Sequence, residues 1–83
     1  MNTYYIVTFQ NTHEAMKAER ETIKKQINVV VIPTPTFITK SCGISLKVTT
    51  ENIEDIINLI RAENIKVKEI FMENGETVKT INI

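Results

Sequence analysis

Cysteine is nearly absent from this sequence: Cys42 is its single copy in 83 residues. One thiol cannot close an intramolecular disulfide, and it lacks the second thiol of a dithiol redox pair or a cysteine-rich metal site. Any chemistry at Cys42 is therefore that of one sulfur atom that accepts a group and passes it on. A single cysteine and no export signal fit a reducing compartment, so we expect a cytoplasmic protein.

An excess of charge and long apolar runs are lacking as well. Ten basic and ten acidic residues give a formal net charge of +0. A phosphate-backbone footprint needs clustered Lys and Arg, so no nucleic-acid partner is expected. No apolar run approaches the roughly 18 residues of a membrane span, so no membrane partner is expected either. A hydrophobic content of 42% is enough for one small core, which predicts a single domain over 1–83 with no metal or cofactor.

Glycine and proline occur only twice each, and they mark the breaks between predicted elements. Pro33 and Pro35 forbid a central strand after residue 33 and favour an irregular, extended loop. Asn74 and Gly75 indicate a hairpin turn near the end of the chain.

Between these breaks the chain alternates between strand and helix periodicity. Asn11 is predicted to cap the first helix with Glu14 as its capping-box partner, and Thr49 or Thr50 to cap the second. The predicted elements are a strand over 3–9, a helix over about 12–26, strands over 28–33 and 44–49, a second helix through residue 60, a strand from 65 or 67 to 72, and a strand over 77–83.

Apolar spacing predicts which side of each helix faces the sheet. The first helix is expected to turn inward Ala15, Met16, Glu19, Ile23 and Ile27. The main packing contacts of the two helices are expected from Met16, Ile23, Ile53, Ile56, Ile57 and Ile60.

The β-α-β-β-α-β order predicts an α+β, ferredoxin-like sandwich with both helices on one face of an antiparallel sheet. The sheet order is expected to be 4-1-3-2, with the C-terminal strand paired back on the fourth. The end of the first strand then lies beside the start of the third, which places Cys42 near the turn 10–13. A helix begins at that turn, and its partial positive charge and free N–H groups favour an anion such as a thiolate.

Five residues are candidate supports for a Cys42 thiolate. His13 is a potential base, or a solvent-exposed first-turn residue, and Thr12 shares that turn. Ser41 can donate to the sulfur or simply form the turn. Gly43 permits a positive φ or the close approach of a partner sulfur, or forms a bulge at the strand entry. Lys40 can supply a positive charge. The five candidates are thus Lys40, Ser41, Gly43, Thr12 and His13.

Two surfaces are candidates for contacts with other proteins. Phe37 and Ile38 either form a docking surface beside the cysteine or hold the loop against the body. The sheet face opposite the helices is expected to be bare and lined by Tyr4, Ile6 and Val30 or its neighbours. An exposed apolar face marks an interface, so we expect a homo-oligomer or a stable partner.

Part of the sequence resembles a known family. Residues 32–35 (Ile-Pro-Thr-Pro) and 38–46 (Ile-Thr-Lys-Ser-Cys-Gly-Ile-Ser-Leu) are similar to the Pro-x-Pro and Ser-Cys-Gly signature of the DUF3343 family of small selenium/sulfur carrier-like proteins. The resemblance runs from about Tyr4 to Phe71. It implies that Cys42 carries persulfide or selenide between a donor and an acceptor protein.

One position departs from the family pattern. An arginine commonly follows the second proline, and Thr36 stands there in this chain. Lys40 would then have to supply the positive charge, without the two-pronged hydrogen bonding of a guanidinium.

Rival functions lack the residues that they need. Metallochaperones of this fold use two cysteines, and RNA-binding versions use aromatic residues on the third strand, which has none. Cysteine-dependent hydrolysis needs a supporting histidine and a substrate cleft, and an 83-residue sandwich has little room for such a cleft. Two functions remain: a sulfur/selenium carrier, rather than a turnover enzyme, and a non-catalytic interaction or regulatory module that oligomerises through its sheet.

Overall fold

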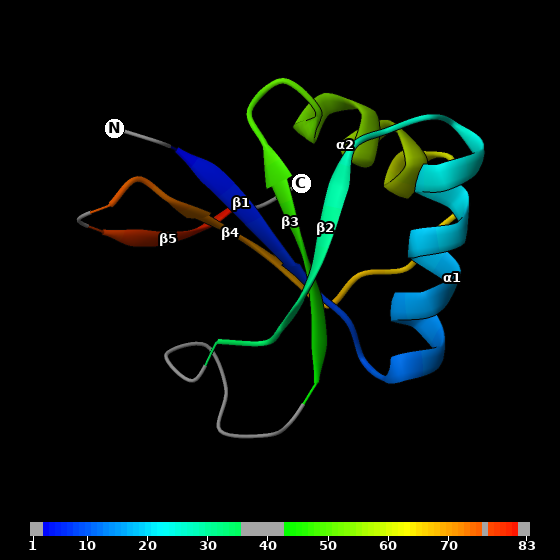
Figure 1. Ribbon diagram of the computed structural model, residues 1–83, viewed down its shortest axis with the longest axis horizontal. Coiled ribbons are helices and arrows are strands. Elements are labelled where there is room, and N and C mark those ends of the chain that lie inside the picture. Colours follow the sequence, from blue (N-terminus) through cyan, green and yellow to red (C-terminus); the bar gives the residue numbers. More distant parts are fainter. Residues whose placement is uncertain (1–2, 36–42, 76, 82–83) are drawn as a thin grey trace.

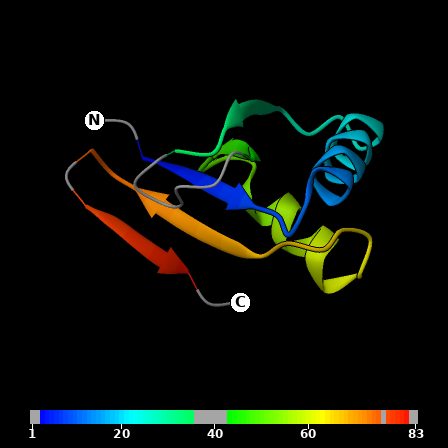
Figure 2. The ribbon, with the colours of Figure 1, turned by 90° about the horizontal axis from the view of Figure 1, so that it is seen from below.

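The structure, a computed structural model, describes residues 3–35, 43–75 and 77–81. The elements, in chain order, are β1 (Tyr4–Thr8), α1 (Thr12–Lys24), β2 (Val29–Pro33), β3 (Ile44–Thr49), α2 (Ile53–Arg61), β4 (Glu69–Glu73) and β5 (Val78–Ile81). The strands form one antiparallel sheet in the order β2-β3-β1-β4-β5. Both helices cover the same face of that sheet (Figures 1 and 2).

This arrangement confirms the predicted α+β, ferredoxin-like fold. β1 lies between β3 and β4, and β2 lies outside β3, as the order 4-1-3-2 requires. The turn at Asn74 and Gly75 is present, with Gly75 at a φ of 95° that a side chain would disfavour. β5 extends the sheet beyond β4 (Figure 2) and does not fold over a face.

Two element starts differ from the prediction. β4 begins at Glu69, because residues 65–68 connect α2 to the sheet; Ile65 is nevertheless buried in the core. Asn52, and neither Thr49 nor Thr50, is the N-cap of α2. Thr49 serves the preceding turn, where its backbone C=O accepts from the Asn52 N–H at 3.1 Å.

The ends of α1 follow local rules. The Asn11 side-chain oxygen accepts from the Glu14 N–H at 2.9 Å, which confirms the predicted N-cap. The helix ends at Lys24, and Gln26 follows with a left-handed φ of 59°. The Ile27 N–H then bonds to the Thr22 C=O at 2.8 Å, so the chain turns back at once into β2.

The inward face predicted for the first helix is correct at Ala15 and Ile27, which are buried, but not at Met16 and Ile23; Glu19 is half-buried. Ala15, Ala18 and Thr22 are buried against the sheet, whereas Met16 and Ile23 are exposed. Small side chains fill the α1 contact, and the Thr22 hydroxyl is satisfied by the Glu19 C=O at 2.7 Å. The expectation that Met16 and Ile23 hold α1 on the sheet is therefore wrong.

The core lies between the helices and the sheet. Strand alternation points Val7, Leu46, Val48 and Ile70 toward the helices. From α2, Ile53 and Ile56 are buried among them, while Ile57 and Ile60 are half-buried and pack against the same cluster, as predicted. Among the described residues, the largest contribution to this core is one cluster of buried side chains: Val7, Ala18, Ile27, Leu46, Val48, Ile53, Ile56, Leu59, Ile65 and Ile70. Within the described ranges, no helix is long and apolar enough to cross a membrane.

The small-residue face of α1 predicts an asymmetric response to added volume. Ala18→Leu should destabilise the fold by about 1–3 kcal/mol, because a larger side chain forces the helix away from a packed sheet. Lys17→Leu, the control one position earlier, should change stability far less. Urea unfolding monitored by circular dichroism measures both, and equal effects would contradict the observed orientation of α1.

Candidate functional site

The predicted carrier residue and several of its neighbours lie outside the described residues. These are Cys42, Ser41, Lys40, Phe37, Ile38 and Thr36, and their roles remain predictions. The residues on either side, Thr34 with Pro35 and Gly43 with Ile44, are described. They show how the two ends of the segment 36–42 are held.

A short neck joins the two ends of this segment. The Thr34 N–H donates to the Gly43 C=O at 2.9 Å, continuing the ladder that pairs Pro33 with Ile44. The hydroxyls of Thr34 and Ser45 form a second bond at 2.6 Å, and Ser45 is 0% exposed. Residue 42 is therefore covalently attached to a strand end that is fixed by two hydrogen bonds.

Gly43 lies close to the Thr34 side chain across this neck. A Cβ atom at residue 43 would lie 3.2 Å from the Thr34 side-chain oxygen, closer than ordinary van der Waals contact. The ladder continues in register through Thr34 and Gly43, so Gly43 does not form the bulge considered from the sequence. The close approach seen here is that of Thr34; an approach by a partner sulfur stays a prediction.

The strand arrangement brings the neck to the end of the molecule where α1 begins. β1 runs antiparallel to β3, with Val7 opposite Leu46, so the end of β1 lies beside the start of β3. Residues 9–11 then lead directly into α1, whose first turn lies at the same end of the sheet as the start of β3 (Figure 1). Thr12 and His13 are exposed in that turn.

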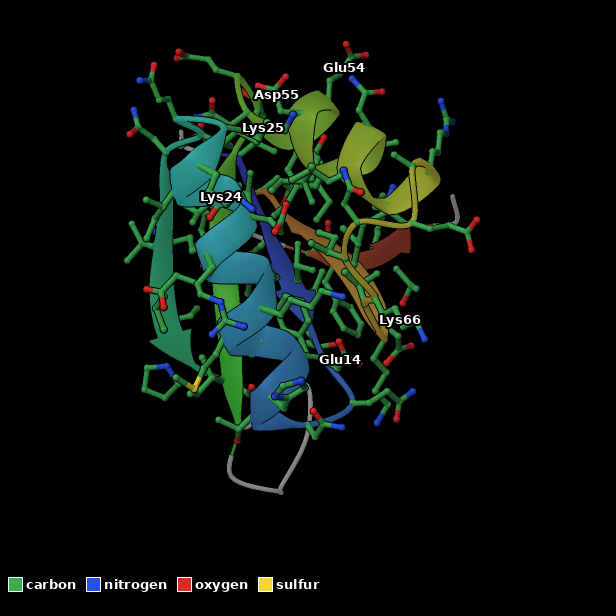
Figure 3. All side chains as sticks on the ribbon, turned by 90° about the vertical axis from the view of Figure 1, so that its right-hand side faces the viewer. Glu14, Lys24, Lys25, Glu54, Asp55 and Lys66 are labelled. Atoms are coloured by element: carbon green, nitrogen blue, oxygen red, sulfur yellow. The ribbon has the colours of Figure 1, made fainter. Side chains whose placement is uncertain are left out.

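The first turn of α1 combines the partial positive charge of the helix start with the negative charge of the Glu14 carboxylate. The N–H groups that begin a helix have no partner within it and favour an anion. Asn11 takes the N–H of Glu14, which leaves those of Thr12 and His13 outside the cap bond. The Glu14 carboxylate belongs to the same turn and lies on the flank of α1 nearer β4 (Figure 3). Its negative charge lowers the positive potential that the helix start offers to a nearby anion.

A shallow hollow near this end was not predicted. Its volume is about 410 Å³, and it lies where the end of β1 meets the chain leaving α2. The sequence signal for it is the apolar pair Ile65 and Val67 in a segment without regular structure. Its lining residues are Gln10, Ile60, Glu63, Ile65, Lys66 and Val67.

The sheet face opposite the helices is only partly bare. Ile6, predicted to be bare there, is 1% exposed, whereas Val30 is 58% exposed on that face, as predicted. The Lys47 ammonium lies 4.4 Å from the centre of the Tyr4 ring, a cation–π contact, and the Tyr4 hydroxyl donates to the Glu73 carboxylate. That hydrogen bond, with burial and the negative charge of Glu73, raises the pKa of Tyr4 above its ordinary value of 10.0. Sequence reasoning missed these contacts because the three residues come from three strands.

Among residues 3–35, 43–75 and 77–81, no group of three or more His, Cys, Asp or Glu side chains is arranged to hold a metal ion.

A family model described as "Putative Se/S carrier protein-like" matches residues 4–72, and the chain belongs to this family of selenium/sulfur carrier-like proteins. Comparisons with curated proteins and with solved structures found no match.

The neck predicts a specific mutational pattern. Thr34→Val should destabilise the fold by about 1–3 kcal/mol, because it leaves the buried Ser45 hydroxyl without its partner. The double variant Thr34→Val with Ser45→Ala should recover much of the loss, since neither buried polar group remains. Urea unfolding of the single and double variants measures this coupling. Additive effects would show that the hydroxyl pair contributes nothing.

The Tyr4–Glu73 bond predicts a pH dependence. The folded state raises the pKa of Tyr4, so it favours the protonated phenol. The stability that the bond contributes is therefore present below pH 10 and lost as the pH rises through the folded-state pKa. Tyr4→Phe should be less stable than the wild type at neutral pH, and the gap should narrow in alkali. A gap that stays constant across unfolding curves at increasing pH would contradict this role for the phenol.

Proposed function

We propose that this protein is a sulfur or selenium carrier in which the Cys42 thiolate accepts one chalcogen atom from a donor protein and releases it to an acceptor. The observation that carries the proposal is the family match over residues 4–72, which spans the one cysteine of the chain. A single thiol suffices for this chemistry, because the atom is held on one sulfur between two partners. The role is that of a carrier and not of a turnover enzyme.

The transfer balances without an external oxidant or reductant. The Cys42 thiolate attacks the outer sulfur of a donor persulfide, a new S–S bond forms on Cys42, and the donor's S–S bond breaks. The donor leaves as its thiolate, and Cys42 becomes a persulfide. An acceptor thiolate reverses the process by attacking the outer sulfur. For selenium, the carried atom is the outer selenium of a donor selenopersulfide: an S–Se bond forms on Cys42, the donor's S–Se bond breaks, and the donor again leaves as its thiolate.

The thiolate is the reactive form, so the proposal needs a source of positive potential near Cys42. The first turn of α1 supports it, since it begins at the sheet end that also holds Gly43. Thr12 and His13 supply backbone N–H groups there, and Ser41 and Lys40 are proposed to add a hydrogen bond and a charge. Lys40 replaces the basic residue that Thr36 does not provide.

The partners are proposed to be donor and acceptor proteins in the cytoplasm. Phe37 and Ile38 belong to the same segment as Cys42, and we assign them to docking beside the thiol. A non-catalytic interaction module is the rival function, and it makes no use of the cysteine. Reactivity of Cys42 therefore separates the two.

The proposal predicts stoichiometric loading. Incubation of the protein with a cysteine desulfurase and cysteine should add one sulfur atom to the chain, visible as a mass increase by intact-mass spectrometry under non-reducing conditions. Cys42→Ser should gain nothing. The folded wild type should also react with iodoacetamide faster at neutral pH than an unstructured cysteine peptide does, because a stabilised thiolate is present at higher fraction. A folded-state thiol that neither loads nor alkylates would leave the interaction module as the function.

Two variants identify what activates the thiol. Glu14→Gln removes the carboxylate from the first turn and keeps the backbone N–H that Asn11 caps, so it should speed alkylation if α1 supplies the potential. His13→Ala should slow it only modestly. A large loss in His13→Ala with no effect of Glu14→Gln would assign activation to the imidazole.

A further inference from the structure

Exposed apolar side chains gather at one edge of the molecule. Among the described strands, β2 is the terminal one of the sheet and pairs with β3. Its Val30 and Val31 are 58% and 42% exposed, and on α1 Met16 and Ile23 are 50% and 66% exposed. Val31 pairs with the buried Leu46 and lies on the helix side of the sheet, whereas Val30 pairs with Lys47 and lies on the opposite face, so the edge is apolar on both faces.

Met16 and Ile23 belong on the flank of α1 that overhangs β2. Residues in a helix are spaced by about 100°, so Met16 and Ile23 share one flank, and Glu14 lies on the opposite flank from Met16. Figure 3 shows Glu14 on the flank nearer β4, with β2 on the other side of the helix. The two apolar side chains therefore extend the exposed surface of Val31 into the helix layer, while Val30 is exposed on the other face of the sheet.

No strand within residues 3–35, 43–75 and 77–81 pairs with the backbone of β2 on its outer side. The bond from Thr34 to Gly43 shows that Thr34 faces β3, and bonded pairs alternate along an antiparallel ladder. Val30 and Ile32 therefore face β3 as well, while Val29, Val31 and Pro33 direct their backbone groups outward. Pro33 has no N–H to offer. Val29 and Val31 thus present two complete donor–acceptor sets to a further strand.

We propose that a second copy of this chain binds this edge, with the two β2 strands paired antiparallel about a two-fold axis at Val30. In that register Val29 of each copy bonds to Val31 of the other, which uses all the complete outward backbone sets. Val30 faces Val30 of the second copy, and no charged side chain enters the strand pair. The two sheets become one continuous ten-stranded sheet.

The helix layer matches the same symmetry. β2 runs back along α1 after the turn at Ile27, so the middle of the helix lies near the middle of the strand (Figure 3). A two-fold axis between Glu19 and Arg20 places each Glu19 opposite Arg20 of the second copy. It also places Met16 opposite Ile23 of the second copy. Both the charges and the apolar side chains are therefore self-complementary, which is what an isologous dimer requires.

This inference goes beyond the carrier function and does not depend on it. Antiparallel pairing sends the two Thr34–Gly43 necks to opposite ends of the dimer, because each neck follows the end of its own β2. Each Cys42 segment then serves its own partners. Sulfur loading should be the same in a variant that cannot dimerise.

The oligomeric state tests the interface directly. Analytical ultracentrifugation of the wild type over a concentration series should show a monomer–dimer equilibrium. Val30→Lys should weaken dimerisation by about 100-fold, because it brings two like charges face to face. Val78→Lys is the matched control: Val78 is an exposed valine on β5, the opposite edge strand, and its substitution should leave the equilibrium unchanged.

The register has its own readout. In a Cys42→Ser background, Val30→Cys should form a disulfide-linked dimer under mild oxidation, since residues facing each other in a non-bonded antiparallel pair have Cα atoms about 4.5 Å apart. Val78→Cys in the same background should cross-link much less. Glu19→Arg or Arg20→Glu alone should weaken the dimer, and the double exchange should restore it. Circular dichroism checks that each variant is folded.

A wild type that stays monomeric over its whole soluble range would overturn the proposal. Equal sensitivity to Val30→Lys and Val78→Lys, or equal cross-linking at both positions, would overturn it too. Loss of sulfur loading in Cys42→Ser with an intact dimer would leave both proposals standing. A dimer whose wild-type Cys42 does not load would remove the carrier function and keep the interface.

Discussion

The structure depends on β1 being paired on both sides. Val7 is fully buried and lies opposite Leu46 of β3 and Ile70 of β4, so one strand joins the two β-α-β halves of the fold. Because β1 is central and antiparallel to β3, its exit into α1 and the entry of β3 share one end of the sheet. That single pairing decides where the segment carrying Cys42 leaves and rejoins the body.

The small side chains between α1 and the sheet determine which larger side chains of the helix are left exposed to solvent. Ala15, Ala18 and Thr22 fill the contact with the sheet, so the larger Met16 and Ile23 are left outside. A helix held by small residues approaches the sheet closely, but it does not cover the edge strand. The exposure of Val31, Met16 and Ile23 on the helix side of β2 thus follows from how the core is packed, and the proposed dimer would cover this surface.

The candidate site has two parts: a neck whose geometry is fixed by the β2–β3 pairing, and the thiol of Cys42, which the sequence identifies. Thr34, Gly43 and Ser45 form the fixed neck, and neither the Thr34–Ser45 bond nor the close approach of Thr34 to Gly43 was predicted. Sequence alone singled out Cys42, because a solitary thiol in a turn-rich segment stands out by composition. The hydrogen bond across the neck could not be predicted from the sequence, because Thr34 and Ser45 are eleven residues apart and are brought together by the β2–β3 register.

The sequence by itself determined the elements, their order, the sheet topology and the family. Apolar periodicity, the Asn11 cap and the Asn74–Gly75 turn are local signals, and the family signature is a local string of residues. Only the tertiary structure decided which flank of α1 is buried, which residues close the neck and how Tyr4 reaches both Lys47 and Glu73. Those outcomes follow from strand register and from the volume available between layers, and both are set by residues distant in the chain.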